Sequence, residues 1–299
     1  KMPSLKEVRN KIVSVGSTMQ ITSAMKMVSA AKLKRAQDAV TQIRPYANKL
    51  RELLENASAS VSEAENKYAR TSKVSNNVLI VAVSSNRGLA GAFNTNIIKK
   101  VNQLINEDYK ANEVTVLPVG KKVQDAFKRT KHNISGQDLP HHNNELFDKL
   151  TYDNISHVAE KVMDAFLNKQ FDKVIIVYNS FRNAAVQVPT EEQLLPVVSS
   201  KAEATTTTTK TGNVDYIFEP GQESIINELI PRSVKTLFYK ALLDSFASEH
   251  GARMTAMHKA TDNAKAMQRD LKIMYNKARQ AAITKEILEI VGGAEALKG

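Results

Sequence analysis

The first part of the chain carries apolar side chains at helical spacing. They recur at alternating intervals of three and four residues, which places them on one face of a helix. The first members are Leu5, Val8, Ile12, Val15 and Met19. A second run, Ile21, Met25 and Val28, is expected to continue the same face, and the pattern extends to about residue 58. It predicts one helix over residues 4–58, roughly 80 Å long at ~1.5 Å per residue.

Two local signals refine this helix. Ser4 and Glu7 have the spacing of a capping box, in which each side chain accepts a hydrogen bond from the other residue's backbone N–H. Pro45 removes a backbone donor and clashes with the preceding turn. We therefore expect a bend near Ile43 rather than a straight rod.

The last part of the chain repeats this behaviour. Apolar and small residues keep a narrow helical face for several turns, which is typical of a coiled-coil seam. They are Met257, Ala260, Ala264, Met267, Leu271, Met274, Ala278 and Ala281. Pro231 suits the first position of this helix, where its missing N–H is harmless, and Gly292 with Gly293 is the first strong stop signal after it.

Neither long helix can bury its stripe in an ordinary globule. The economical arrangement is an antiparallel coiled coil of the two helices, with the middle of the chain between them as a separate domain. The expected division is therefore a helix at 1–58, a central α/β domain at 74–220 and a second helix at 221–299.

The apolar pattern changes between the two helices. Continuous apolar runs of strand length are expected for strands buried on both faces of a parallel sheet. Such runs occupy residues 78–83, 114–117 and 174–178, and amphipathic helical patterns occupy 94–108, 121–131 and 154–169. Their order predicts a Rossmann-like, three-layer α/β domain. Residues 186–188 and 214–218 are candidate edge strands, and residues 199–212, with five consecutive threonines, are expected to form a surface loop.

No catalytic, cofactor or metal site emerges from the residues. The turn at 84–92 has glycine only at 88 and 91, without the G-x-G-x-x-G spacing that admits a pyrophosphate, so we interpret it as structural. Gly120 with the two lysines after it lacks the rest of a P-loop. The six histidines show no paired-ligand spacing, and His141 with His142 is interpreted as part of a solvated loop. The absence of cysteine excludes disulfides, thiolate metal sites and a cysteine nucleophile.

Charge leaves two classes of partner open. The chain carries a net charge of +11, of which residues 1–58 hold +7 and residues 221–299 hold +3. A basic coiled coil suits an acidic protein partner, but it also suits nucleic acid. Tyr46 is the single aromatic residue in positions 1–67, which disfavours readout of single strands by stacking. The longest uncharged runs, 12–25 and 74–86, fall short of the ~18–20 apolar residues of a membrane-spanning helix.

Seven segments, in order along the chain, carry patterns of one known family. They lie at residues 21–32, 44–46, 85–91, 247–257, 260–263, 275–286 and 290–294. Together they resemble the gamma subunit of F-type ATP synthases, of the bacterial type. Asn86 and Ala90 depart from the family pattern, which usually has Asp and Cys there, and the cysteine-bearing insertion of chloroplast members is missing.

The resemblance implies a rotor shaft without an active site or cofactor of its own. In the family, the paired terminal helices pass through the alpha3beta3 hexamer, and the α/β domain sits with the epsilon subunit against the c-ring. Proton flow turns the c-ring and the shaft, and the asymmetric shaft cycles the nucleotide affinity of each catalytic beta subunit. The implied location is peripheral, on the cytoplasmic side of the bacterial inner membrane.

The resemblance also implies contact residues. By position in the motifs, Met25, Arg253 and Gln280 correspond to the contact with beta, with Glu249 and Thr284 supporting the coupling. A compact Met at a coil surface and a planar Arg fork suit a sliding, charge-sensitive contact. For Met25 the alternative is ordinary seam packing. For the whole chain the alternative is a basic coiled-coil protein that binds nucleic acid or a nucleotide.

Overall fold

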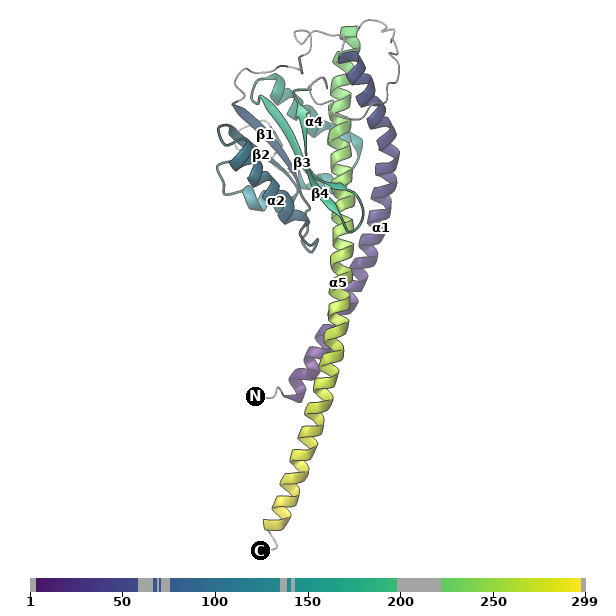
Figure 1. Ribbon diagram of the computed structural model, residues 1–299, viewed down its shortest axis with the longest axis vertical. Helices are drawn as coiled ribbons and strands as arrows, with labels where there is room; N and C mark the ends of the chain where they lie inside the picture. Colours follow the sequence, from purple (N-terminus) through teal and green to yellow (C-terminus); the bar gives the residue numbers. More distant parts are fainter. Residues whose placement is uncertain are drawn as a thin grey trace. The chain divides into compact units, whose positions relative to one another are not determined.

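The computed structural model describes residues 4–58, 67–68, 70, 76–134, 139–140, 143–197 and 222–296 (Figure 1). The chain forms two compact units. The paired-helix unit consists of Lys1–Ala30 and Arg253–Gly299, and the α/β unit consists of Ala31–Ala252. Two long helices, α1 (Leu5–Ser58) and α5 (Gln222–Ala296), contribute to both units.

Helix α1 begins at the predicted capping box. The Ser4 backbone N–H donates to the Glu7 carboxylate at 3.2 Å, and the Glu7 N–H donates to the Ser4 hydroxyl at 3.3 Å. The first backbone N–H groups of a helix have no carbonyl of a preceding turn to donate to, and these side-chain contacts supply acceptors for two of them. Helix α1 runs from Leu5 to Ser58, which confirms the predicted helix over residues 4–58. Pro45 lies inside α1, and the bend at this point stays a prediction.

The antiparallel pairing of the two helices is confirmed in the paired-helix unit. A Cβ added at Gly16 would lie 3.0 Å from the Gln268 side chain, and the hydroxyls of Thr22 and Thr261 are 2.8 Å apart. The contacts advance along α1 as they recede along α5. The seam residues of α5 follow alternating steps of four and three, as in a heptad repeat. They are Met257, Thr261, Ala264, Gln268, Leu271, Tyr275 and Ala278, each buried or half-buried.

Part of the predicted seam is wrong. Ile21 and Val28 are 60% and 57% exposed, whereas Thr22 and Ser29 are buried. A 3.5-residue step from Met19 reaches positions 22 and 29, so polar residues occupy the seam and apolar ones face outward. The same shift leaves Met267 and Met274 of α5 exposed.

Two predicted signals for the ends of the second helix, Pro231 as its first residue and Gly292 with Gly293 as its stop, are also wrong. Helix α5 begins at Gln222, passes through Pro231, and continues through both glycines to Ala296. Proline removes one backbone hydrogen bond, but Ile230 and Val234 on either side are 0% and 3% exposed. Burial of this face stabilises the helix across the proline because packing outweighs local propensity. Gly292 and Gly293 are tolerated at about 1 kcal/mol each in a helix.

The α/β unit contains a four-stranded sheet in the order β2-β1-β3-β4. The three predicted strands, β1 (Asn77–Val83), β2 (Glu113–Val119) and β3 (Lys173–Phe181), are confirmed and pair in parallel. Strand β4 (Gln187–Leu195) is antiparallel to β3 and far longer than the predicted 186–188. The other candidate edge strand, 214–218, and the threonine-rich segment 199–212 lie outside the described residues.

Helices cover both faces of this sheet, as predicted for a three-layer domain (Figure 1). One face packs against α2 (Phe93–Gln103), which ends in a π turn (Leu104–Asp108), and against α3 (Lys121–Phe127). The other face packs against α4 (Tyr152–Leu167). Part of α5 shares that second layer, with Ile230, Val234, Phe238, Ala241 and Leu242 in the same core. The start of the second long helix therefore belongs to the domain core.

Candidate functional surfaces

The turn after β1 is closed by its own side chains. The Val123 backbone N–H donates to the Ser84 hydroxyl at 3.0 Å, and the Lys121 N–H donates to the Asn86 side-chain oxygen at 3.1 Å. A Cβ at Gly120, where φ is +105°, would lie 2.2 Å from the Ser84 carbonyl oxygen. Both donors lie at the start of α3, and in the turn itself the Ser85 N–H donates to the Asn94 side-chain oxygen at 3.0 Å, so these backbone donors already have partners. This geometry matches the interpretation of the turn as structural.

Leu89 in the same turn was missed by sequence reasoning. Its φ is +63°, in the left-handed region, and its side chain is 64% exposed. This conformation costs roughly 1 kcal/mol or more for a residue with a Cβ, and the next left-handed residue, Gly91, carries no such cost. The composition of the turn gives no signal for it, because the glycines at 88 and 91 are the residues expected to adopt a left-handed conformation, not the leucine between them.

The histidines do not assemble a metal site in the described part of the chain. No group of three or more His, Asp or Glu side chains there is placed to hold a metal ion. His258 lies 3.3 Å from the Lys26 ammonium and 3.5 Å from the Asp262 carboxylate, within the paired-helix unit. His141 and His142 lie outside the described residues. No described helix combines the length and apolar character needed to cross a bilayer.

The five predicted contact residues fall into two environments. Gln280 and Thr284 are exposed on α5, where the Thr284 hydroxyl donates to the Gln280 carbonyl at 3.0 Å. Met25 is half-buried on α1. Glu249 in the α/β unit and Arg253 in the paired-helix unit are each only 7% exposed. The structure therefore places Gln280 with Thr284 but does not present all five side chains on one open surface.

The end of α5 is an open apolar surface. Every described residue from 279 to 296 is exposed. Its large apolar side chains, which we call the apolar tip, are between 49% and 67% exposed; they are Ile283, Ile287, Leu288, Ile290 and Val291. Exposed clusters of this kind mark surfaces that a partner covers.

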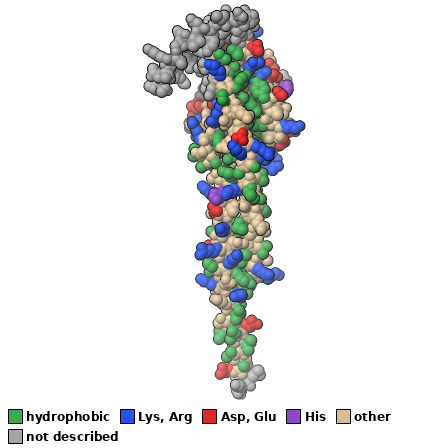
Figure 2. Space-filling model, turned by 90° about the vertical axis from the view of Figure 1, so that its right-hand side faces the viewer, with side chains coloured by type: hydrophobic (Ala, Val, Ile, Leu, Met, Phe, Trp, Pro, Cys, Tyr) green, Lys and Arg blue, Asp and Glu red, His purple; other side chains and the backbone are tan. Residues whose placement is uncertain are grey.

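Positive charge is concentrated beside this surface. The paired-helix unit carries 14 Lys and Arg against six Asp and Glu, which is +8 of the chain's +11. Figure 2 shows Lys and Arg side chains distributed along the long helices, with apolar side chains between them. The unit thus combines long-range attraction for an acidic surface with apolar area for close contact.

Polar contacts fasten α5 to the α/β unit. The Lys235 ammonium donates to the Glu160 carboxylate of α4 at 2.6 Å, and this hydrogen bond lowers the Glu160 pKa. The Ser248 hydroxyl donates to the Asn179 carbonyl of β3 at 2.9 Å in a buried contact. At Gly251 an added Cβ would meet the Cα of Ala184 at 3.2 Å. Together with the shared core, these contacts make α5 and the sheet one packed body within this unit.

Comparisons with known proteins agree with this architecture. A family model described as ATP synthase matches residues 4–297. The ATP synthase gamma chains of Christiangramia forsetii and Flavobacterium johnsoniae are 54% and 53% identical, each alignment covering 100% of both chains.

Solved structures show the same fold. A chain from the central stalk and c-ring of the Tetrahymena thermophila mitochondrial ATP synthase matches with a TM-score of 0.56 and 25% identity, over 80% of this chain and 99% of that one. A chain from the Euglena gracilis mitochondrial ATP synthase matches with a TM-score of 0.63 and 19% identity, over 98% of this chain and 94% of that one.

Proposed function

The chain belongs to the gamma-chain family of ATP synthases, and it is a central rotor shaft; we propose that its paired-helix unit is the part that acts on the catalytic subunits. The observation that carries this proposal is the end of α5, where every residue from 279 to 296 is exposed and large apolar side chains form the apolar tip. A helix with such a surface gains stability when a partner encloses it.

The proposed partner of this unit is the alpha3beta3 hexamer. A shaft of two unlike helices presents a different surface in each direction, because seam, apolar and basic positions alternate around it. Each beta subunit would then meet a different face and be held in a different conformation. Rotation exchanges the faces, so a nucleotide site on beta passes through states of different affinity. The shaft does mechanical work without binding nucleotide itself.

The proposed partners of the α/β unit are the epsilon subunit and the c-ring. Torque applied to this unit enters α5 directly, because Phe238 and its neighbours lie in the same core as the sheet. Helix α5 then continues without interruption to Ala296. One covalent helix therefore links the driven unit to the surface that contacts beta. Through these partners the chain would be peripheral to the bacterial inner membrane, on its cytoplasmic side.

The five predicted residues divide into two roles in this proposal. Gln280 and Thr284 are accessible side chains that can contact beta directly, and half-buried Met25 can present its thioether to a sliding surface. Glu249 and Arg253 are buried, so their proposed role is to position the helix surface around them.

Co-purification tests the proposal. We expect the tagged full chain, expressed with alpha and beta subunits, to be recovered with both as a hexamer around one shaft. Duplex DNA binding with a steep salt dependence, without recovery of alpha and beta, would contradict it in favour of the nucleic-acid alternative.

A matched pair of variants localises the contact. Ile287→Asp combined with Leu288→Asp changes exposed residues of the apolar tip and should lower the recovery of alpha and beta severalfold without unfolding the chain. Val188→Asp makes the same kind of change at a 41% exposed position of β4 and should leave recovery unchanged. Equal recovery with both variants would count against the apolar tip as the contact.

A further inference from the structure

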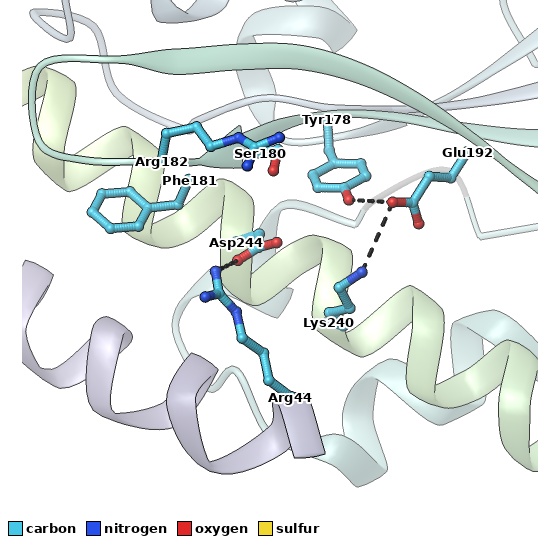
Figure 3. A pocket seen from close by; sticks show the side chains of 8 residues that line it. All are labelled: Arg44, Tyr178, Ser180, Phe181, Arg182, Glu192, Lys240 and Asp244. Carbon is cyan, nitrogen blue, oxygen red and sulfur yellow. Dashed lines mark hydrogen bonds and ion pairs between the residues drawn. The ribbon is translucent and has the colours of Figure 1, made fainter. Parts of the chain in front are cut away.

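A polar pocket lies inside the α/β unit, apart from the surfaces discussed above. It has a volume of about 260 Å³ and is lined by residues of α1, β3, β4 and α5 (Figure 3). Three cationic side chains reach it from three different elements: Arg44 from α1, Arg182 from the end of β3, and Lys240 from α5. Such convergence of cations is typical of a site for an oxyanion.

The cations of this pocket are incompletely paired. The Arg44 guanidinium is 3.8 Å from the Asp244 carboxylate, and the Lys240 ammonium is 3.8 Å from the Glu192 carboxylate. Both separations exceed hydrogen-bond length, so most of the N–H donors stay available. The side chain of Arg182 is exposed at the pocket edge. Three cations face two carboxylates, which leaves the pocket with a formal charge of +1.

The two carboxylates also have unused capacity. Glu192 accepts a hydrogen bond from the Tyr178 hydroxyl at 2.7 Å through one oxygen, while its other oxygen is buried without a hydrogen bond. The Asp244 side chain is 4% exposed, and its Oδ1 is buried without a hydrogen bond as well. A buried acceptor without a donor is costly, by about 1–3 kcal/mol. Burial accordingly raises the pKa of Asp244.

One small ligand can offer acceptors to the three cations and a donor to the buried carboxylate oxygens. Inorganic phosphate at neutral pH has P–O⁻ oxygens that accept hydrogen bonds from Arg and Lys, and it retains a P–OH that donates one. Sulfate is fully ionised at this pH and has no proton to donate, so the carboxylates would repel it. A phosphomonoester, with a second pKa of about 6, has largely lost its P–OH at neutral pH.

We propose that this pocket binds inorganic phosphate, with the phosphate oxygens held by Arg44, Arg182 and Lys240 and the P–OH donated to Asp244 Oδ1. The site connects α1 with α5 and the sheet, so an occupying phosphate would join the three by direct hydrogen bonds. The carboxylate makes the site selective for a protonated oxyanion rather than for negative charge in general.

Calorimetric titration of the full chain tests this at neutral pH and constant ionic strength. We expect saturable binding of inorganic phosphate at one site per chain, with sulfate and glycerol phosphate at least about tenfold weaker, as the loss of one charge-assisted hydrogen bond implies. Absent phosphate binding, or equal binding of phosphate and sulfate, would overturn the proposal. Tighter binding of glycerol phosphate would overturn the choice of the free ion.

Variants separate selectivity from affinity. Asp244→Asn should remove the preference for phosphate over sulfate, whereas Arg182→Gln should weaken both anions about tenfold and keep the preference. Arg129→Gln changes an exposed arginine outside the pocket and should alter neither. If Asp244→Asn does not fold, Asp244→Ser, which also removes the carboxylate, provides the same selectivity test. Unchanged selectivity in the folded variant would refute the role of the carboxylates.

Discussion

Phe238 offers the sharpest test of how α5 is joined to the α/β unit. Its ring is 0% exposed and belongs to the same core as Leu79 of β1, Phe166 of α4 and Ile176 of β3. Replacing a buried Phe by Ala costs about 3–5 kcal/mol, because apolar contacts are lost and a cavity remains. Native domains are stable by about 5–15 kcal/mol in total, so this loss is a large fraction of the whole.

We therefore expect Phe238→Ala to lower the free energy of unfolding of the α/β unit by about 3–5 kcal/mol. Urea unfolding followed by tyrosine fluorescence measures this, since Tyr178 lies in the same core. Hydrogen exchange of the β1 and β3 amides assigns the loss to the sheet. Met267→Ala, at a 55% exposed position of α5, is the matched control and should change stability by no more than about 0.5 kcal/mol.

A Phe238→Ala variant that costs no more stability than the Met267→Ala control, and leaves hydrogen exchange in the sheet unchanged, would refute the shared core of α5 and the sheet. In that case α5 would lie against the unit without being part of its core. Torque would then have to pass from the sheet to the helix through weaker surface contacts.

Three further outcomes are expected. Gly120→Ala should destabilise the α/β unit by about 3 kcal/mol or more in thermal or urea unfolding, because the new Cβ meets the Ser84 carbonyl oxygen at 2.2 Å and φ is +105°. A variant as stable as the wild type would argue against this close approach. Burial raises the Asp244 pKa, so the folded chain retains a proton that the unfolded chain releases, and this contribution to stability is lost as pH rises above about 4. Asp244→Asn should thus gain stability relative to the wild type as the pH rises above about 4, and a pH-independent difference would disagree. Met25→Lys should reduce ATP-driven proton pumping in reassembled membranes more than it reduces folding, because it adds a cation to a basic helix; unchanged pumping would exclude Met25 from the contact.

The apolar pattern predicted the main elements because it reflects burial directly. The runs at 78–83 and 174–178 are buried on both faces of the sheet, as expected for short continuous apolar segments in a parallel sheet between helices. Strand β4 was predicted only in part, at 186–188, because an edge strand faces solvent on one side, and its Glu191 and Glu192 lack the alternation of a half-buried strand.

The contact surfaces were less accessible to sequence reasoning. The family motifs named Arg253 and Gln280 alike, yet only the structure shows that the first is buried and the second exposed. The coil seam was misjudged at Ile21 because hydrophobicity suggested burial, whereas heptad spacing gave the seam position to Thr22. Asp244 had a weak signal, as the one acid in an otherwise apolar or small stretch of helix, but its partners lie on other elements.

Rotation is the central claim, and a single-molecule measurement tests it most directly. The chain has no cysteine, so Lys110→Cys on the exposed surface of the α/β unit gives one attachment point for a bead on this subunit. With the complex fixed to a surface through its beta subunits, we expect ATP to drive continuous rotation of the bead in one direction. A bead that stays fixed while the same complexes hydrolyse ATP and retain the shaft would contradict the account.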